Sequence, residues 1–270
     1  MIDLLQFEFI RNAIFASILS SIACGIIGCY IIVKRLVFIS GGISHTAFGG
    51  IGLGYLLGVN PIYTITPFSL AAAISIALLS KKTKVYEDTA IGIFWALGMA
   101  LGIILIGFSD GYAPDLMGYL FGNILTVPLS DIFLMITLDI IIVLTVMILY
   151  QEFLAICFDE EYAETQGVKT LSLYIILLCL ISLTIVILIK IVGIILVISL
   201  LTIPAAISQQ ITYNLKKMML LSIVLGIIFT LGGLIISYNF NLASGATIVL
   251  MAGSFYFIIL ALKYLLKLNN

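Results

Sequence analysis

One histidine and one carboxylate stand inside long apolar stretches of the sequence. His45 is the only histidine and lies in SGGISHTAFGG, and Asp139 lies in FLMITLDIIIVLTV. A neutral imidazole is a common transition-metal ligand, and a carboxylate attracts or coordinates cations. Ionisable side chains within a lipid bilayer are costly and usually functional. The two residues predict a transient cation site if their segments adjoin. The alternative is that each is a hydrogen-bonded structural residue.

A second group of polar residues forms the only long polar insert between two apolar stretches, FDEEYAETQGVKT at 158–170. Ala163 and Gly167 are four residues apart and would share one face of a short helix, with acids on the neighbouring faces. The acids of the insert are Asp159, Glu160, Glu161 and Glu164. One interpretation is a solvated loop. The other is a docking helix that fits a cleft on a soluble partner.

Catalytic motifs are missing from the sequence. It contains no HExxH and no G-x-x-x-x-G-K-[ST] phosphate-binding loop, so it predicts neither a zinc protease nor an ATPase. An intramembrane serine protease would need a Ser–His pair, but Ser244 in NLASGAT lacks the glycine two residues earlier that a GxS motif has. We therefore expect no enzyme and no permanently bound cofactor.

The composition defines the elements that must carry these residues. Of 270 residues, 63% are hydrophobic and 9% are charged, whereas soluble domains are about 25% charged. The apolar runs are continuous rather than alternating, which favours membrane-spanning helices over a barrel. The sequence predicts an all-α, polytopic, multi-pass protein of the plasma membrane with a single domain, 1–270. It has no basic tract for nucleic acid.

About nine transmembrane helices are expected. The predicted spans are 11–33, 43–59, 62–80, 89–108, 131–150, 171–189, 191–213, 218–237 and 245–262. The apolar segment 116–130 is short for a span, which takes about 20 residues, so we expect a re-entrant or interfacial piece there.

The distribution of Lys and Arg predicts the orientation of these spans. If the N-terminus is outside and 116–130 returns to the side it left, ten of the twelve basic residues are cytoplasmic. Those ten are Lys34, Arg35, Lys81, Lys82, Lys84, Lys169, Lys216, Lys217, Lys263 and Lys267. Only Arg11 and Lys190 then lie outside, a bias that follows the positive-inside rule.

Two further patterns concern helix packing. Glycines recur four residues apart at Gly50, Gly54 and Gly58 and again at Gly98 and Gly102. This spacing lets helix backbones approach closely in lipid. Pro204 lies inside the predicted span 191–213, where a proline is expected to kink the helix.

Five blocks of the sequence, in this order, resemble the permease subunits of metal-ion ABC importers, the family of zinc and manganese uptake permeases. The blocks are KRLVFISGGISHTAFGG at 34–50, GYLFGNIL at 118–125, FDEEYAETQGV at 158–168, VGIILVISLLTIPAA at 192–206 and SGATIVL at 244–250. Together they extend over most of the chain.

The resemblance implies a type II-like ABC importer permease that forms a homodimer in membrane lipid and transports a divalent metal, zinc or manganese. It implies a cytoplasmic ABC ATPase subunit and an extracellular or periplasmic metal-binding protein as partners. It also implies that 158–168 is the coupling helix, with Asp159, Glu161, Ala163 and Gly167 facing the ATPase. His45 matches the histidine that lines the family's metal path.

One position departs from the family pattern. Many members have an Asp four residues before this histidine, where this chain has Gly41. Losing an oxygen ligand weakens the argument for manganese and favours zinc. An alternative function, an ion-gradient-driven secondary transporter, needs no ATPase, but such folds often show paired repeats and we find none here.

Overall fold

The computed structural model describes residues 6–109 and 116–268, apart from the side chains of residues 190, 195 and 266–268. Throughout this part the regular elements are helices and no strand occurs. They are α1 (Glu8–Lys34), α2 (Val37–Leu57), α3 (Ile62–Lys82), α4 (Glu87–Gly107), α5 (Leu116–Phe121), the 3-10 turn η2 (Ile124–Thr126), α6 (Leu129–Ile148), α7 (Tyr150–Phe158), α8 (Glu160–Thr165), α9 (Thr170–Ile211), α10 (Leu215–Phe240) and α11 (Ser244–Leu268). The predicted all-α class is confirmed.

Seven of these helices are long and apolar enough to cross a membrane. They are α1, α3, α4, α6, the Thr170–Ile189 part of α9, α10 and α11. α2 has 21 residues but is not among them, and the apolar stretch Leu196–Ile211 is shorter than a span. The structure thus supports seven of the nine expected spans, and the other two stay a prediction.

The spans expected at 171–189 and 191–213 meet in one element, α9, which is broken at Gly193. This residue has φ 75° and ψ 165°, inside a run of otherwise helical residues. Glycine adopts a positive φ without the steric cost that a Cβ brings. Pro204 lies within the helical second part of α9, and the backbone leaves helical geometry at Gly193, not at the proline that we expected to kink it.

The short helix α5 fills the space beside this break. A Cβ added to Gly122 would lie 2.4 Å from the backbone nitrogen of Gly193, and one added to Gly245 would lie 2.5 Å from the carbonyl oxygen of Phe121. Three glycines therefore let α5, α9 and the start of α11 approach backbone to backbone. A Cβ at any of them would force these segments apart.

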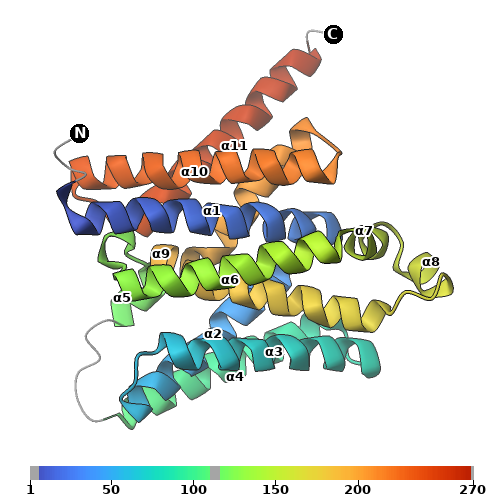
Figure 1. The fold of residues 1–270 in the computed structure, drawn as a ribbon, viewed down its shortest axis with the longest axis horizontal. Coiled ribbons are helices and arrows are strands. Elements are labelled where there is room, and N and C mark those ends of the chain that lie inside the picture. Colours follow the sequence, from blue (N-terminus) through green and yellow to red (C-terminus); the bar gives the residue numbers. More distant parts are fainter. Residues whose placement is uncertain (1–5, 110–115, 269–270) are drawn as a thin grey trace.

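α5 does not cross the molecule. Its six residues extend about 9 Å, far less than a bilayer core of about 30 Å. Figure 1 shows the end of α4, α5 and the start of α6 at the same, left-hand end of the bundle. The expectation that 116–130 returns to the side it left agrees with this arrangement.

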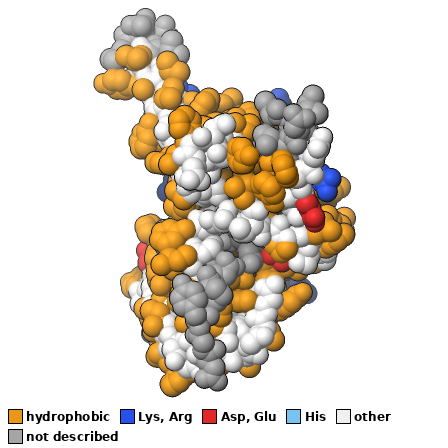
Figure 2. Space-filling model, turned by 90° about the vertical axis from the view of Figure 1, so that its left-hand side faces the viewer, with side chains coloured by type: hydrophobic (Ala, Val, Ile, Leu, Met, Phe, Trp, Pro, Cys, Tyr) orange, Lys and Arg blue, Asp and Glu red, His pale blue; other side chains and the backbone are white. Residues whose placement is uncertain are grey.

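The two ends of the bundle differ in their charge. Figure 1 places α7 and α8 at the right-hand end, beside the C-terminal ends of α1 and α3, which carry Lys34, Lys81 and Lys82. The opposite end, which faces the viewer in Figure 2, shows mainly apolar side chains with a few scattered charges. This asymmetry follows the predicted arrangement of basic residues.

Candidate metal path and docking helix

The imidazole of His45 is stacked on the indole of Trp95. The two ring centroids are 4.2 Å apart and the ring planes differ by 8°. His45 comes from α2 and Trp95 from α4, and both side chains are half-buried. The Nδ1 atom of His45 is buried and has no hydrogen-bond partner among the described residues. The stack holds the ring plane, and no hydrogen bond within the described residues occupies this nitrogen.

Glycines bring α2 and α4 close enough for this stack. A Cβ added to Gly98 would lie 2.4 Å from the Cα of Thr46, and one added to Gly102 would lie 2.5 Å from the carbonyl oxygen of Phe48. The predicted packing role of Gly98 and Gly102 is therefore confirmed. Gly50 and Gly54 instead face α3, whereas Gly58 ends α2 as a left-handed cap with φ 64°.

Gly41 lies one helical turn before His45 on α2. A Cβ added to it would meet the Cδ1 atom of Ile198 at 2.8 Å and the Trp95 ring at 3.5 Å. The closer neighbour is the free end of a flexible side chain, so a carboxylate could occupy this position if Ile198 rotates. An aspartate at this position would therefore require Ile198 to move.

Asp139 is buried on α6, at 5% exposure, and neither carboxylate oxygen has a hydrogen-bond partner among the described residues. α6 packs on α1 and α9, whereas α2 packs on α3, α4 and α9. Since α2 and α6 share no substantial interface, one copy of the chain does not bring Asp139 against His45. No group of three or more His, Cys, Asp or Glu residues suited to a metal occurs in the part of the chain that the structure describes.

The segment predicted as a docking helix contains α8, which Asp159 caps. The Asp159 side chain accepts a hydrogen bond from the backbone N–H of Tyr162 at 2.9 Å. At the other end, the N–H groups of Gly167 and Val168 donate to the carbonyl oxygens of Glu164 and Ala163, with φ 83° at Gly167. This is the Schellman pattern that commonly ends a helix at glycine. A capped helix, not an irregular loop, therefore occupies 160–165.

Glu160 ties this helix to two spans. Its carboxylate accepts hydrogen bonds from Lys34 at the end of α1 (2.8 Å) and from Lys81 at the end of α3 (2.7 Å). Both ammonium groups lie over the ring of Tyr174 on α9. Burial alone would raise the pKa of Glu160, but the hydrogen bonds and charges of the two lysines outweigh it and lower the pKa below its ordinary value.

The exposed face of α8 differs from the one we expected. Ala163 is buried at 2% exposure and packs into its own chain, so its side chain anchors α8 and does not face outward. Phe158 and Tyr162 are 78% and 63% exposed, and Glu161, Glu164 and Gly167 also lie at the surface. Exposed aromatic rings are enriched at surfaces that bind another protein.

Sequence reasoning missed two residues of these sites, Trp95 and Glu160. No local pattern marks Trp95, because its role depends on which helix packs against α2. For Glu160 a signal existed: basic residues close two predicted spans on the side where the acidic insert lies. An acidic residue of this insert was therefore a candidate for an ion pair with Lys34 or Lys81, and in the structure that residue is Glu160.

The chain is similar to known membrane proteins along most of its length. The family described as "ABC 3 transport family" matches residues 6–263. The chain is 48% identical, over 97% of its length and 94% of the other, to an uncharacterised membrane protein of Synechocystis. It is 38% identical, over 94% of its length and 91% of the other, to the manganese transport system membrane protein MntC of Listeria monocytogenes.

A solved structure extends the likeness to the fold. PsaBC from Streptococcus pneumoniae, determined in complex with Fab, superimposes with a TM-score of 0.86 at 37% identity, over 95% of this chain and 93% of that one. The matched residues include α2, α4, the broken α9 and the docking helix α8. The chain is therefore a multi-pass plasma-membrane protein that belongs to the ABC 3 transport family.

Proposed function

We propose that this chain is the permease subunit of an ABC importer that carries a divalent transition metal ion across the membrane. It would act as a homodimer with two copies of a separate cytoplasmic ATPase and receive its cargo from an extracellular or periplasmic metal-binding protein. The observation that carries the proposal is His45, a half-buried imidazole with an unpartnered nitrogen, in a chain of the ABC 3 transport family.

The cargo is proposed as manganese or zinc, and two lines of support point in different directions. The Listeria relative is named for manganese transport. Manganese prefers oxygen ligands, yet Gly41 supplies none, whereas an imidazole nitrogen suits zinc well. Because a single chain groups no three ligands among its described residues, the path would use His45 from both copies of the dimer, with water completing the coordination.

The coupling of ATP hydrolysis to transport is assigned to α8. Tyr162 and Glu161 lie on its outward face, Phe158 at the end of α7 adds a second exposed aromatic ring beside it, and Asp159 and Gly167 shape the two ends of α8. Ala163 would fix the helix against its own chain.

We propose nine membrane crossings, adding α2 and the second part of α9 to the seven apolar spans.

Reconstituting the permease with its ATPase in vesicles tests this function. We expect uptake of radioactive manganese or zinc that requires ATP, and His45→Gln should reduce it at least tenfold while dimer assembly stays intact. Glutamine keeps much of the volume and the hydrogen bonding but removes the imidazole ligand. Gly41→Asp should raise the ratio of manganese to zinc uptake several-fold, and Gly41→Asn is its uncharged control.

Two results would contradict the proposal. Uptake that needs an ion gradient but no ATPase would favour the secondary transporter. Parental transport by His45→Gln would make His45 a structural residue.

A further inference from the structure

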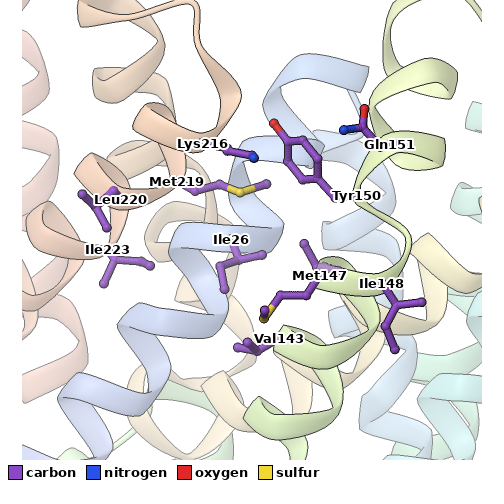
Figure 3. A pocket seen from close by; sticks show the side chains of 11 residues that line it. Ile26, Val143, Met147, Ile148, Tyr150, Gln151, Lys216, Met219, Leu220 and Ile223 are labelled. Carbon is purple, nitrogen blue, oxygen red and sulfur yellow. The ribbon is translucent and has the colours of Figure 1, made fainter.

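A groove of about 480 Å³ lies between α1, α6, α7 and α10 (Figure 3), and neither His45 nor a residue of α8 lines it. Its walls are aliphatic and thioether side chains, among them Ile26 on α1, Met147 on α6 and Met219 on α10. Three polar side chains, Tyr150, Gln151 and Lys216, stand together at one end of it (Figure 3). The groove therefore has an apolar body and a polar mouth.

The mouth lies where the spans end. Tyr150 begins α7 directly after α6, and Lys216 is in the first turn of α10. Both positions belong to the predicted cytoplasmic end, at the level of lipid head groups. The body of the groove extends from there along about the last two turns of α6 and the first two turns of α10, beside Ile26 of α1. An apolar groove open to a bilayer at this depth is bounded by acyl chains or by another protein.

Lys216 supplies the charge at the mouth. Its Nζ atom lies 4.8 Å from the centroid of the Tyr150 ring, a cation–π distance. It forms no salt bridge within the described residues, and in Figure 3 the Tyr150 ring lies between its ammonium group and the amide of Gln151. An ammonium without a carboxylate partner, together with an amide and a phenol, suits the phosphate of an anionic head group.

A second copy of the chain is a less suitable occupant of this groove. The least buried of the seven candidate spans are α4 and α11, each with 22% of its apolar window buried, against 39% for α6 and for α10. α4 and α11 therefore leave more of their apolar surface uncovered by this chain, and offer more of it to a second copy, than α6 and α10 do. α4 also carries Trp95 of the proposed path, which places the expected dimer contact near His45.

We propose that this groove binds an anionic phospholipid of the cytoplasmic leaflet. One acyl chain would lie between Met147 and Met219, and the phosphate would contact Lys216 with Gln151 and Tyr150 beside it. The lipid would bridge α6, α7 and α10 at the end of the bundle that carries α8. This site is independent of the transported metal, so it stands or falls apart from the proposed function.

Native mass spectrometry of the full-length protein, with phosphatidylglycerol and phosphatidylcholine as probes, tests the site. We expect preferential retention of phosphatidylglycerol. Lys216→Ala should weaken it about fivefold, since one lysine near an anionic surface contributes about 1 kcal/mol. Lys217→Ala is the matched control, because Lys217 is the exposed neighbour that does not line the groove. Met147→Trp, at a position 70% exposed, should block the groove and release both lipids.

Three results would overturn the proposal. Equal retention of the two lipids by the parent protein would show no selectivity for charge. Equal losses in Lys216→Ala and Lys217→Ala would indicate general surface attraction. Conversion of a dimer to monomers by Met147→Trp would show that a second copy, not a lipid, covers this groove.

Discussion

At the scale of the residue, Glu160 joins the docking helix to the ends of two spans. Its side chain is 28% exposed and that of Lys34 only 10%, so solvent screens this pair less than an open surface pair. Glu160→Gln should loosen α8 by about 1 kcal/mol, the upper end for exposed ion pairs. We expect faster hydrogen exchange at 159–168 and less metal transported per ATP hydrolysed.

The pH dependence of this contact follows from its lowered pKa. The stabilisation is present above the ordinary carboxyl pKa and is lost as the pH falls through the lowered pKa of Glu160 in the folded chain.

Glu164→Gln is the control for the hydrogen-exchange experiment, because Glu164 is exposed on the same helix and forms no salt bridge among the described residues. Equal exchange in both variants would contradict the role of Glu160.

Single residues were predictable where their type alone is unusual. His45 and Asp139 stand out because polar side chains are rare in such apolar segments. Their neighbours were not predictable, because Trp95 reaches His45 only through the pairing of α2 with α4. Asp139 and His45 lie on helices without a substantial shared interface, and no one-dimensional pattern reveals which helices adjoin.

At the scale of the element, the contact of α2 with α4 holds the His45–Trp95 stack. Gly98→Ala would place a Cβ 2.4 Å from the Cα of Thr46, so the helices must separate. Overpacking of this kind costs about 1–3 kcal/mol. Trp95 is the only tryptophan, so its fluorescence spectrum should shift as the stack opens.

Gly92→Ala on the same helix is the matched control for this experiment. A Cβ added to Gly92 meets nothing within 4 Å among the described atoms, so its alanine variant should keep the parental fluorescence and melting temperature. If Gly98→Ala also keeps both, the glycine does not set the distance between α2 and α4.

The glycine spacing predicted close helix packing but not its partners. Gly98 and Gly102 pack on α2, and Gly50 and Gly54 pack on α3, whereas Gly58 ends its helix. The break at Gly193 was also hidden, because a glycine among apolar residues looks the same in an intact helix. The backbone of α5 that approaches Gly193, where φ is positive, is distant in the sequence.

At the scale of the whole molecule, hydropathy and the counting of basic residues predicted most of the architecture. Apolar runs of spanning length are a local property, so seven spans and the short 116–130 segment agree with the helices described. Two expected spans are exceptions: the second part of α9 is too short, and the polar and small residues of α2 weaken its apolar signal. The bundle brings Lys34, Lys81 and Lys82 to the end that carries α8, as the count requires (Figure 1).

The orientation of this bundle in the membrane is the remaining prediction. Basic residues gather at the end with α8, and the positive-inside rule makes that end cytoplasmic. A cysteine introduced at Glu164 should therefore react with a membrane-impermeant maleimide only after cells are permeabilised. One introduced at Leu242, exposed in the turn between α10 and α11, should react in intact cells. The parent protein gives the background of its four native cysteines. Labelling at 164 but not at 242 in intact cells would show that the topology is the reverse of the predicted one. α8 would then lie outside the cell, where no cytoplasmic ATPase reaches it.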